Sequence, residues 1–154
     1  MKYFEDVVIG TRTELGSYTF DAESIKAFAR KYDPQAFHMD EEAAARSHFG
    51  KLVASGWHTA AVSMRLVVDG TRRANANQKG DILKSGPSPG VRDVRWHKPV
   101  YVGDTISYAT EIVELREVSR PGWGLMLTKS TGTNQHGEIV YSAQGAVFVE
   151  RRPK

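Results

Sequence analysis

The stretch Ser55–Val68, SGWHTAAVSMRLVV, decides the fold because it carries the strongest helix pattern in the chain. Its apolar residues recur at intervals of three and four, at Ala60, Ala61, Met64, Val67 and Val68. The small residues near its start allow a sheet to pack closely around it. Ser55 is a typical N-cap, which leaves the first backbone N–H groups of the predicted helix without partners inside it.

Four segments that follow this helix predict β-strands, because they are rich in β-branched and aromatic residues. They are Val91–Trp96, Thr105–Val118, Gly124–Asn134 and Glu138–Arg151. Short glycine-containing turns, Arg120–Gly122 and Gln135–Gly137, join the last three of them, and such short connections predict an antiparallel sheet. The preceding segment Asp69–Gly90 is rich in Gly, Asn, Lys, Ser and Pro, and it predicts a connecting loop.

The N-terminal part of the chain predicts one strand and two short helices. Thr13–Phe20 alternates as a strand does, and Asp21 then offers an N-cap for a helix that runs to Tyr32. Asp40–Arg46 predicts a second helix, with acidic residues at its start and a basic residue at its end. Helices combined with a mostly antiparallel sheet indicate an α+β fold.

Between those two helices lies the segment Tyr32–Asp40, YDPQAFHMD, which holds the candidate catalytic residues. Pro34 pushes Asp33 out of the α region, so the segment predicts a loop. Asp33 and His38 lie five residues apart on it, and a carboxylate paired with an imidazole can activate water at neutral pH. The alternative stays open that Asp33 only caps the next element and that His38 fills a polar niche.

From Asp33 the chain continues DPQAFHMDEEAAARSHFGKLVASGWHTA, and this stretch resembles the MaoC-like dehydratases, a family that includes (R)-specific enoyl-CoA hydratases of the hotdog fold. ASGWHT, Ala54–Thr59, resembles the family's entry to its central helix, and PVYVGDT, Pro99–Thr105, resembles a later turn of the family. The resemblance covers nearly the whole chain. It implies one hotdog domain over residues 1–154, in which an antiparallel sheet wraps around a central helix, with Asp33 and His38 as the catalytic pair.

The resemblance also implies a reaction: a hydratase or dehydratase that acts on the C2–C3 bond of an enoyl or 3-hydroxyacyl thioester. The start of the central helix, at Ser55, Gly56 and Trp57, is then expected to bind the thioester oxygen through backbone donors. Coenzyme A or an acyl-carrier phosphopantetheine arm belongs to the substrate, and neither a further cofactor nor a metal is expected. One position departs from the family, because Met64, next to Ser63, stands where some of these hydratases carry a serine. This departure leaves open which group, if any, orients the catalytic pair or the substrate in this chain.

Three other functions compete with the hydratase. A structural dimer without an acyl ligand would leave the segment around Asp33 and Pro34 unexplained. A hotdog acyl-CoA thioesterase would use a similar pocket, but the Asp33/His38 pair argues against it. A non-catalytic acyl-thioester-binding protein would bind its ligand without turnover. Met64, in place of the serine of some family members, keeps this alternative open. In each case a homodimer or higher homo-oligomer is expected, because long strands leave open sheet edges and the family pairs its subunits.

The composition fits a compact cytoplasmic protein of 154 residues without cysteine, which excludes disulfides and thiolate catalysis. The N-terminal residues lack the apolar region of a signal peptide, and no apolar run is long enough for a bilayer. The net charge of +3 comes from scattered basic residues, which argues against nucleic acid and suits an anionic acyl thioester. His48, His97 and His136 lack metal-ligand spacing, and His58 is expected to be a core or capping histidine.

Overall fold

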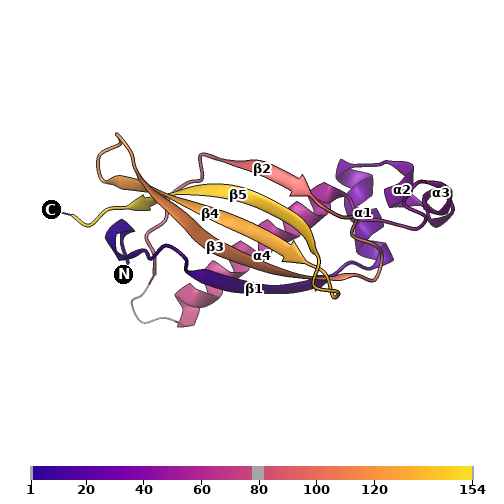
Figure 1. Cartoon of the computed structure of the whole chain (residues 1–154), viewed down its shortest axis with the longest axis horizontal. Helices are drawn as coiled ribbons and strands as arrows, with labels where there is room; N and C mark the ends of the chain where they lie inside the picture. The colour runs from indigo at the N-terminus through magenta and orange to yellow at the C-terminus, as the bar shows by residue number, and fades with distance from the viewer. Residues whose placement is uncertain (1, 78–81, 154) are drawn as a thin grey trace.

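The computed structural model describes residues 2–77 and 82–153 of the chain and shows a curved sheet with one long helix across it (Figure 1). The strands are β1 (Arg12–Thr19), β2 (Gly90–Trp96), β3 (Thr105–Glu117), β4 (Trp123–Thr133) and β5 (Ile139–Glu150). The helices are α1 (Ala22–Tyr32), α2 (Ala36–Met39), α3 (Glu41–Arg46) and α4 (Gly56–Asn77), with a 3-10 turn, η1 (Phe4–Asp6), near the N-terminus. Neighbouring strands are antiparallel, in the order β1-β3-β4-β5-β2. The predicted antiparallel sheet and α+β fold are confirmed.

The main hydrophobic core lies between the sheet and α4. Its buried residues are Leu15, Phe20, Ile25, Ala44, Leu52, Ala54, Val62, Val100, Ile106, Tyr108, Val140, Tyr141 and Ala143. Tyr108 is fully buried in β3, and its hydroxyl donates a 3.0 Å hydrogen bond to the carbonyl oxygen of Thr59 in the first turn of α4. The sheet therefore wraps around α4, which is the hotdog arrangement predicted from the sequence.

The predicted end of the central helix at Val68 is wrong, because α4 continues to Asn77. The first part of the predicted loop Asp69–Gly90 is therefore helical, and residues 78–81 of that loop lie outside the described residues. Even at this length α4 is not apolar enough to cross a membrane, and neither is any other helix in the described part of the chain.

One local and one long-range contact lie along the second half of α4. Arg65 pairs with Asp69 four residues on, at 2.7 Å, an exposed pair that contributes only about 0.3–0.5 kcal/mol. Further along, the guanidinium of Arg73 donates a 3.4 Å hydrogen bond to the carbonyl oxygen of Leu15 in β1. This contact ties the part of α4 beyond Val68 to the sheet, and Arg72 and Arg73 there are themselves good helix formers.

The short helices α1, α2 and α3 gather at the end of the sheet beside the start of α4 (Figure 1). Asp21 caps α1 as predicted, because its carboxylate accepts a 2.7 Å hydrogen bond from the backbone N–H of Ser24. Asp40 caps α3 in the same way through the N–H of Ala43, also at 2.7 Å. Capping of this kind contributes about 1 kcal/mol per helix, which is a large share of the stability of such short elements.

The predicted loop Tyr32–Asp40 is only partly a loop, because Ala36–Met39 forms the single turn α2. Pro34 restricts the backbone of the residue before it but not of those after it, so the chain can return to helix beyond Gln35. His38 therefore lies on a helical turn rather than in an irregular loop. This turn gives its side chain a defined direction toward the start of α4.

Candidate active site

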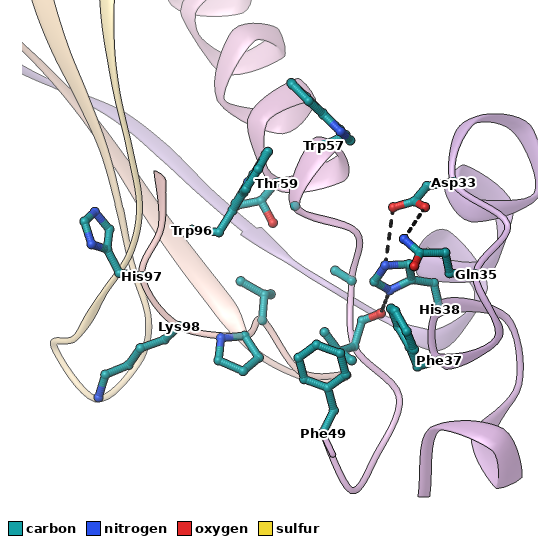
Figure 2. Close-up of a pocket in the computed structure, with 15 residues that line it drawn as sticks. Asp33, Gln35, Phe37, His38, Phe49, Trp57, Thr59, Trp96, His97 and Lys98 are labelled. Carbon is teal, nitrogen blue, oxygen red and sulfur yellow. Dashed lines mark hydrogen bonds and ion pairs between the residues drawn. The ribbon is translucent and has the colours of Figure 1, made fainter. Parts of the chain in front are cut away.

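A cavity of about 400 Å³ lies beside the start of α4, the turn α2 and the end of β2 (Figure 2). Its lining residues come from 33–59 and from 96–100, so two segments far apart in the sequence meet here. The predicted catalytic residues Asp33 and His38 both line it, as do Gly56 and Trp57. Ser55 is fully buried next to them.

Asp33 follows the last residue of α1, and Pro34 fixes its backbone. Its φ of −153° and ψ of 68° lie outside the α region, as a residue before proline requires. Its Oδ2 accepts a 2.7 Å hydrogen bond from the hydroxyl of Ser55, and its Oδ1 accepts a 2.8 Å hydrogen bond from the amide of Gln35. Burial raises the pKa of Asp33, but these hydrogen bonds and the charge of His38 outweigh burial and hold the pKa below its ordinary value. The carboxylate is therefore ionised at neutral pH.

His38 is buried, and its two ring nitrogens have distinct partners. Its Nδ1 lies 2.6 Å from the carbonyl oxygen of Val53, and because a carbonyl oxygen can only accept, Nδ1 carries a proton. Its Nε2 lies 3.3 Å from Oδ2 of Asp33 (Figure 2). In the neutral ring Nε2 is therefore the unprotonated nitrogen, and it faces the Asp33 carboxylate. The two residues singled out in the sequence form one acid–base unit.

The hydroxyl of Ser55, at the start of α4, serves two partners. It accepts a 3.2 Å hydrogen bond from the N–H of Trp57, which confirms the predicted N-cap. It also donates the 2.7 Å hydrogen bond to Asp33. Ser55 thus contacts the candidate catalytic pair through its side chain, whereas the sequence indicated only a cap and a backbone donor.

Among the described residues, the first turn of α4 leaves one backbone donor beside the cavity without a partner. The N–H of Trp57 is bound by Ser55, and those of His58 and Thr59 donate to the Ser55 carbonyl oxygen at 3.0 and 3.2 Å. Gly56 lines the cavity, and its N–H makes no hydrogen bond with any residue that the structure describes. Gly56 is therefore the predicted binding residue that both lines the cavity and keeps its donor available.

Trp57 and Trp96 form an aromatic rim on the cavity (Figure 2). Their rings meet edge to face with centroids 5.0 Å apart, and they are 59% and 44% exposed. The ring of Trp96 also covers Gly56, since a Cβ added at position 56 would lie 2.4 Å from the nearest indole atom. Only glycine therefore fits at this position without moving the indole.

The rest of the wall is mostly apolar, with a charged group at the far end. Phe37 packs edge to face on Phe49 at 5.1 Å and on the ring of His38 at 4.6 Å. Lys98 also lines the cavity, and its ammonium forms an ion pair with Glu138. Apolar walls around the Asp33/His38 pair strengthen its electrostatic interactions, because they lower the local dielectric.

His58 is a core histidine, as the sequence predicted, and does not line the cavity. Its ring stacks on Phe28 at 4.7 Å and meets Phe20 edge to face at 4.9 Å. Burial lowers the pKa of His58 to about 4, against the opposing charge of Asp21, so the ring is neutral at neutral pH. In the described residues, no three His, Asp or Glu side chains are grouped so as to hold a metal ion.

The position where some MaoC-like hydratases carry a serine does not serve this site. Met64 is 54% exposed on α4, and Ser63 is buried beside Tyr141 of β5. Neither residue lines the cavity. The hydroxyl that reaches Asp33 comes instead from Ser55, one residue before the helix begins.

Three partners of the pair were not found from the sequence: the amide of Gln35, the carbonyl of Val53 and the hydroxyl contact of Ser55. Gln35 lies two residues after Asp33, so its proximity was a local signal that could have been used. A backbone carbonyl has no residue type to reveal it. The Ser55 contact spans 22 residues and depends on how the chain folds back.

The site combines a carboxylate and an imidazole beside the N-terminus of the central helix of a hotdog fold. This arrangement defines a class of proteins with an acid–base pair next to an apolar cavity. The chain belongs to the family described as MaoC like domain, whose model matches residues 6–134. That match includes both members of the pair and the start of α4.

Individual relatives agree with this family. A solved MaoC-like dehydratase from Rhodospirillum rubrum is 36% identical, with a TM-score of 0.82 over 100% of both chains. A solved monoamine oxidase regulatory protein from Archaeoglobus is 29% identical, with a TM-score of 0.84, and the match covers 99% of this chain and 96% of that one. The 3-hydroxybutyryl-CoA dehydratase of Methylorubrum extorquens is 29% identical over 97% of this chain and 85% of that protein. Two of these three relatives are named as dehydratases, and both are similar to this chain over most of its length.

Proposed function

We propose that this protein adds water across the C2–C3 double bond of an enoyl thioester, or removes it from the corresponding 3-hydroxyacyl thioester. The observation that carries the proposal is the Asp33/His38 pair, whose Oδ2 and Nε2 lie 3.3 Å apart on the wall of an apolar cavity. Membership of the MaoC-like family and the similarity to a 3-hydroxybutyryl-CoA dehydratase support this type of reaction.

In the proposed reaction the pair binds one water molecule. A neutral Nε2 of His38 and the carboxylate of Asp33 both accept hydrogen bonds, so the water donates to them and turns its oxygen toward C3. As the C3–O bond forms, the pair takes one proton from the water and returns one proton to C2, so the O–H bond that breaks is matched by a C–H bond that forms and the pair ends unchanged. Any imidazolium formed on the way is stabilised by the adjacent carboxylate.

The start of α4 is the proposed site for the thioester oxygen. Negative charge develops on this oxygen while C3 is attacked, and a donor placed there lowers the barrier. Gly56 provides the available N–H, and the positive end of the helix dipole adds to it. The apolar wall makes this stabilisation larger than it would be in water.

The substrate brings its own handle, coenzyme A or an acyl-carrier phosphopantetheine arm. Hydration causes no net oxidation or reduction of the substrate, and the pair supplies the proton transfers, so the proposal invokes no metal and no redox cofactor. A volume of about 400 Å³ is in the usual range for small-molecule sites. The net charge of +3 suits a ligand that carries phosphates.

We further propose that two copies of the chain pair. Trp57, Met64 and Val68 are exposed and lie on one face of α4, since they are seven and four residues apart. Val91 and Trp96 are exposed on β2, which is an edge strand of the sheet. Because both tryptophans line the cavity, a second copy on this surface would also cover the cavity mouth.

A panel of enoyl-CoA substrates of increasing chain length tests the function. Hydration consumes the ultraviolet absorbance of the enoyl thioester and yields a 3-hydroxyacyl product without free coenzyme A. The variant Asp33→Asn is the matched control, because it keeps the shape of the side chain and should retain binding of a saturated acyl-CoA while losing turnover. Release of free coenzyme A would instead identify a thioesterase, and binding of the whole panel without turnover would identify a non-catalytic binding protein.

A further inference from the structure

The segment Leu52–Ser55, which leads into α4, is held rigidly in the core. All four residues are at most 4% exposed. The carbonyl oxygen of Leu52 accepts a 3.0 Å hydrogen bond from Val102, and the N–H of Ala54 donates a 2.8 Å hydrogen bond to the carbonyl oxygen of Val100. The segment therefore pairs with the chain after β2 like a short strand, and it cannot shift without breaking these bonds.

This buried segment contacts both members of the acid–base pair. The carbonyl oxygen of Val53 accepts the 2.6 Å hydrogen bond from Nδ1 of His38, which Figure 2 shows as a dashed line. Two residues later, the hydroxyl of Ser55 donates its 2.7 Å hydrogen bond to Oδ2 of Asp33. Since both contacts start from one extended piece of backbone, their separation is set by the chain itself.

We propose that Ser55 is a positioning residue whose hydroxyl holds the Asp33 carboxylate in the orientation that faces Nε2 of His38. Ser55 does not line the cavity, so it acts on the reaction through Asp33 and not on the substrate. The catalytic consequence rests on the hydration proposed above, whereas the effect on the carboxylate itself does not.

The direction of the Ser55 hydroxyl proton is determined by its two partners. The N–H of Trp57 donates to Oγ, so one lone pair is occupied. The carboxylate of Asp33 can only accept, and the single hydroxyl proton therefore points to Oδ2. A hydrogen bond of this kind favours the carboxylate over the carboxylic acid, and the lowered pKa of Asp33 agrees with it although burial acts in the opposite direction.

The neighbouring groups on α4 offer no replacement for this hydroxyl. Ser63 is buried against Tyr141, and Met64 carries no hydroxyl and is exposed. The amide of Gln35 binds the other carboxylate oxygen, Oδ1, so it restrains Asp33 but leaves Oδ2 without a donor. Loss of the Ser55 hydroxyl should therefore free the oxygen that faces His38.

The test compares three variants in the full chain. Ser55→Gly removes the hydroxyl and keeps most of the capping, because glycine is well accepted at an N-cap. Ser55→Thr keeps the hydroxyl. Ser63→Ala is the matched control, since it removes another buried hydroxyl from the same helix without contact to Asp33.

The primary measurement is the pKa of Asp33, which is determined by NMR titration of its carboxyl carbon. A hydrogen bond to a charged group is strong enough for Ser55→Gly to raise this pKa by about one pH unit, while Ser55→Thr and Ser63→Ala stay near the parent. The acid limb of the hydration pH profile should move by the same amount. The kcat should fall about tenfold with little change in KM, because the substrate contacts are untouched.

Equal Asp33 pKa values in the parent and in Ser55→Gly would overturn the proposal, and so would an equal shift in Ser63→Ala. If Ser55→Gly does not fold, the Asp33 pKa of the parent protein tests the proposal by itself. An Asp33 that titrates at or above the ordinary value of about 3.9 contradicts the proposed hydrogen bond, and a lower value supports it. If the Asp33 pKa responds as expected but the parent hydrates no enoyl-CoA, the positioning role stands and the hydratase function fails.

Discussion

The buried ring of His58 should make the stability of this protein depend on pH in a way that one substitution removes. His58 is 6% exposed and lies between Phe28 and Phe20. Its Nδ1 is buried, with no hydrogen-bond partner in the described part of the chain. Burial therefore lowers the pKa of His58 from 6.5 to about 4, although the charge of Asp21 acts against this. The variant His58→Phe keeps a stacked ring and removes the titrating group.

The sign and size of the effect follow from proton binding. Above about pH 6.5 the ring is neutral in both the folded and the unfolded chain, so His58 adds no pH dependence. Between pH 6.5 and about 4 the unfolded chain binds a proton that the folded protein excludes, so the free energy of unfolding falls as the pH falls. A shift from 6.5 to about 4 corresponds to a loss of about 3 kcal/mol across this window.

Urea unfolding at a series of pH values between neutral and about 4 measures this loss. Other groups titrate in both proteins, so the difference between parent and His58→Phe isolates the histidine. Phenylalanine is larger than histidine, and overpacking costs about 1–3 kcal/mol, but this offset is the same at every pH and drops out of the comparison. On acidification the parent should lose about 3 kcal/mol more than the variant. His136→Gln, at an exposed turn, is the control and should follow the parent. Parallel pH dependence in parent and His58→Phe would refute the reasoning, since it would mean that the folded core accepts the charged ring without cost.

Three further predictions concern the site and its surface. Gly56→Ala places a methyl group 2.4 Å from the ring of Trp96, so tryptophan fluorescence should change and hydration should fall about 100-fold as access to the helix donor is lost; unchanged turnover would place the thioester oxygen elsewhere. Asp33→Asn and His38→Gln should each cost on the order of 4 kcal/mol in transition-state stabilisation, and the double variant little more, whereas additive losses in the hydration assay would show that the two do not act on one water. Met64→Lys puts a charge into the proposed pairing surface and should shift sedimentation from dimer to monomer; a monomeric parent would refute the pairing.

Local patterns predicted most of the secondary structure, because strands, caps and turns depend on neighbours in the sequence. The strand predicted at Thr105–Val118 is found as Thr105–Glu117, and the N-cap at Asp21 is where the sequence placed it. The end of α4 was missed because its last turns are supported by contacts such as that of Arg73 with Leu15, 58 residues apart. A window of neighbouring residues contains no signal for such a contact.

The site was predictable only as far as residue types and spacing reach. Asp33 and His38 could be paired because they lie close in the sequence on a segment broken by proline. Of their partners, the amide of Gln35 was within reach of local reasoning, whereas the backbone carbonyl of Val53 and the hydroxyl of Ser55 could not be inferred. A serine at a helix start has an ordinary role as a cap, and this role hid its contact with Asp33.

The N-cap position has a physical advantage over a position further along the helix for orienting an acid–base carboxylate. The N–H of Trp57 donates to the Ser55 hydroxyl and restricts its orientation, so that its proton points at Asp33. The carboxylate also lies at the positive end of α4, next to the proposed donor of Gly56. In the proposed hydration the pair loses negative charge when it takes the proton from water, while the thioester oxygen gains negative charge beside the same helix end. The field of α4 thus stabilises one negative charge throughout the step, and the protein needs little reorganisation as that charge moves from the pair to the substrate.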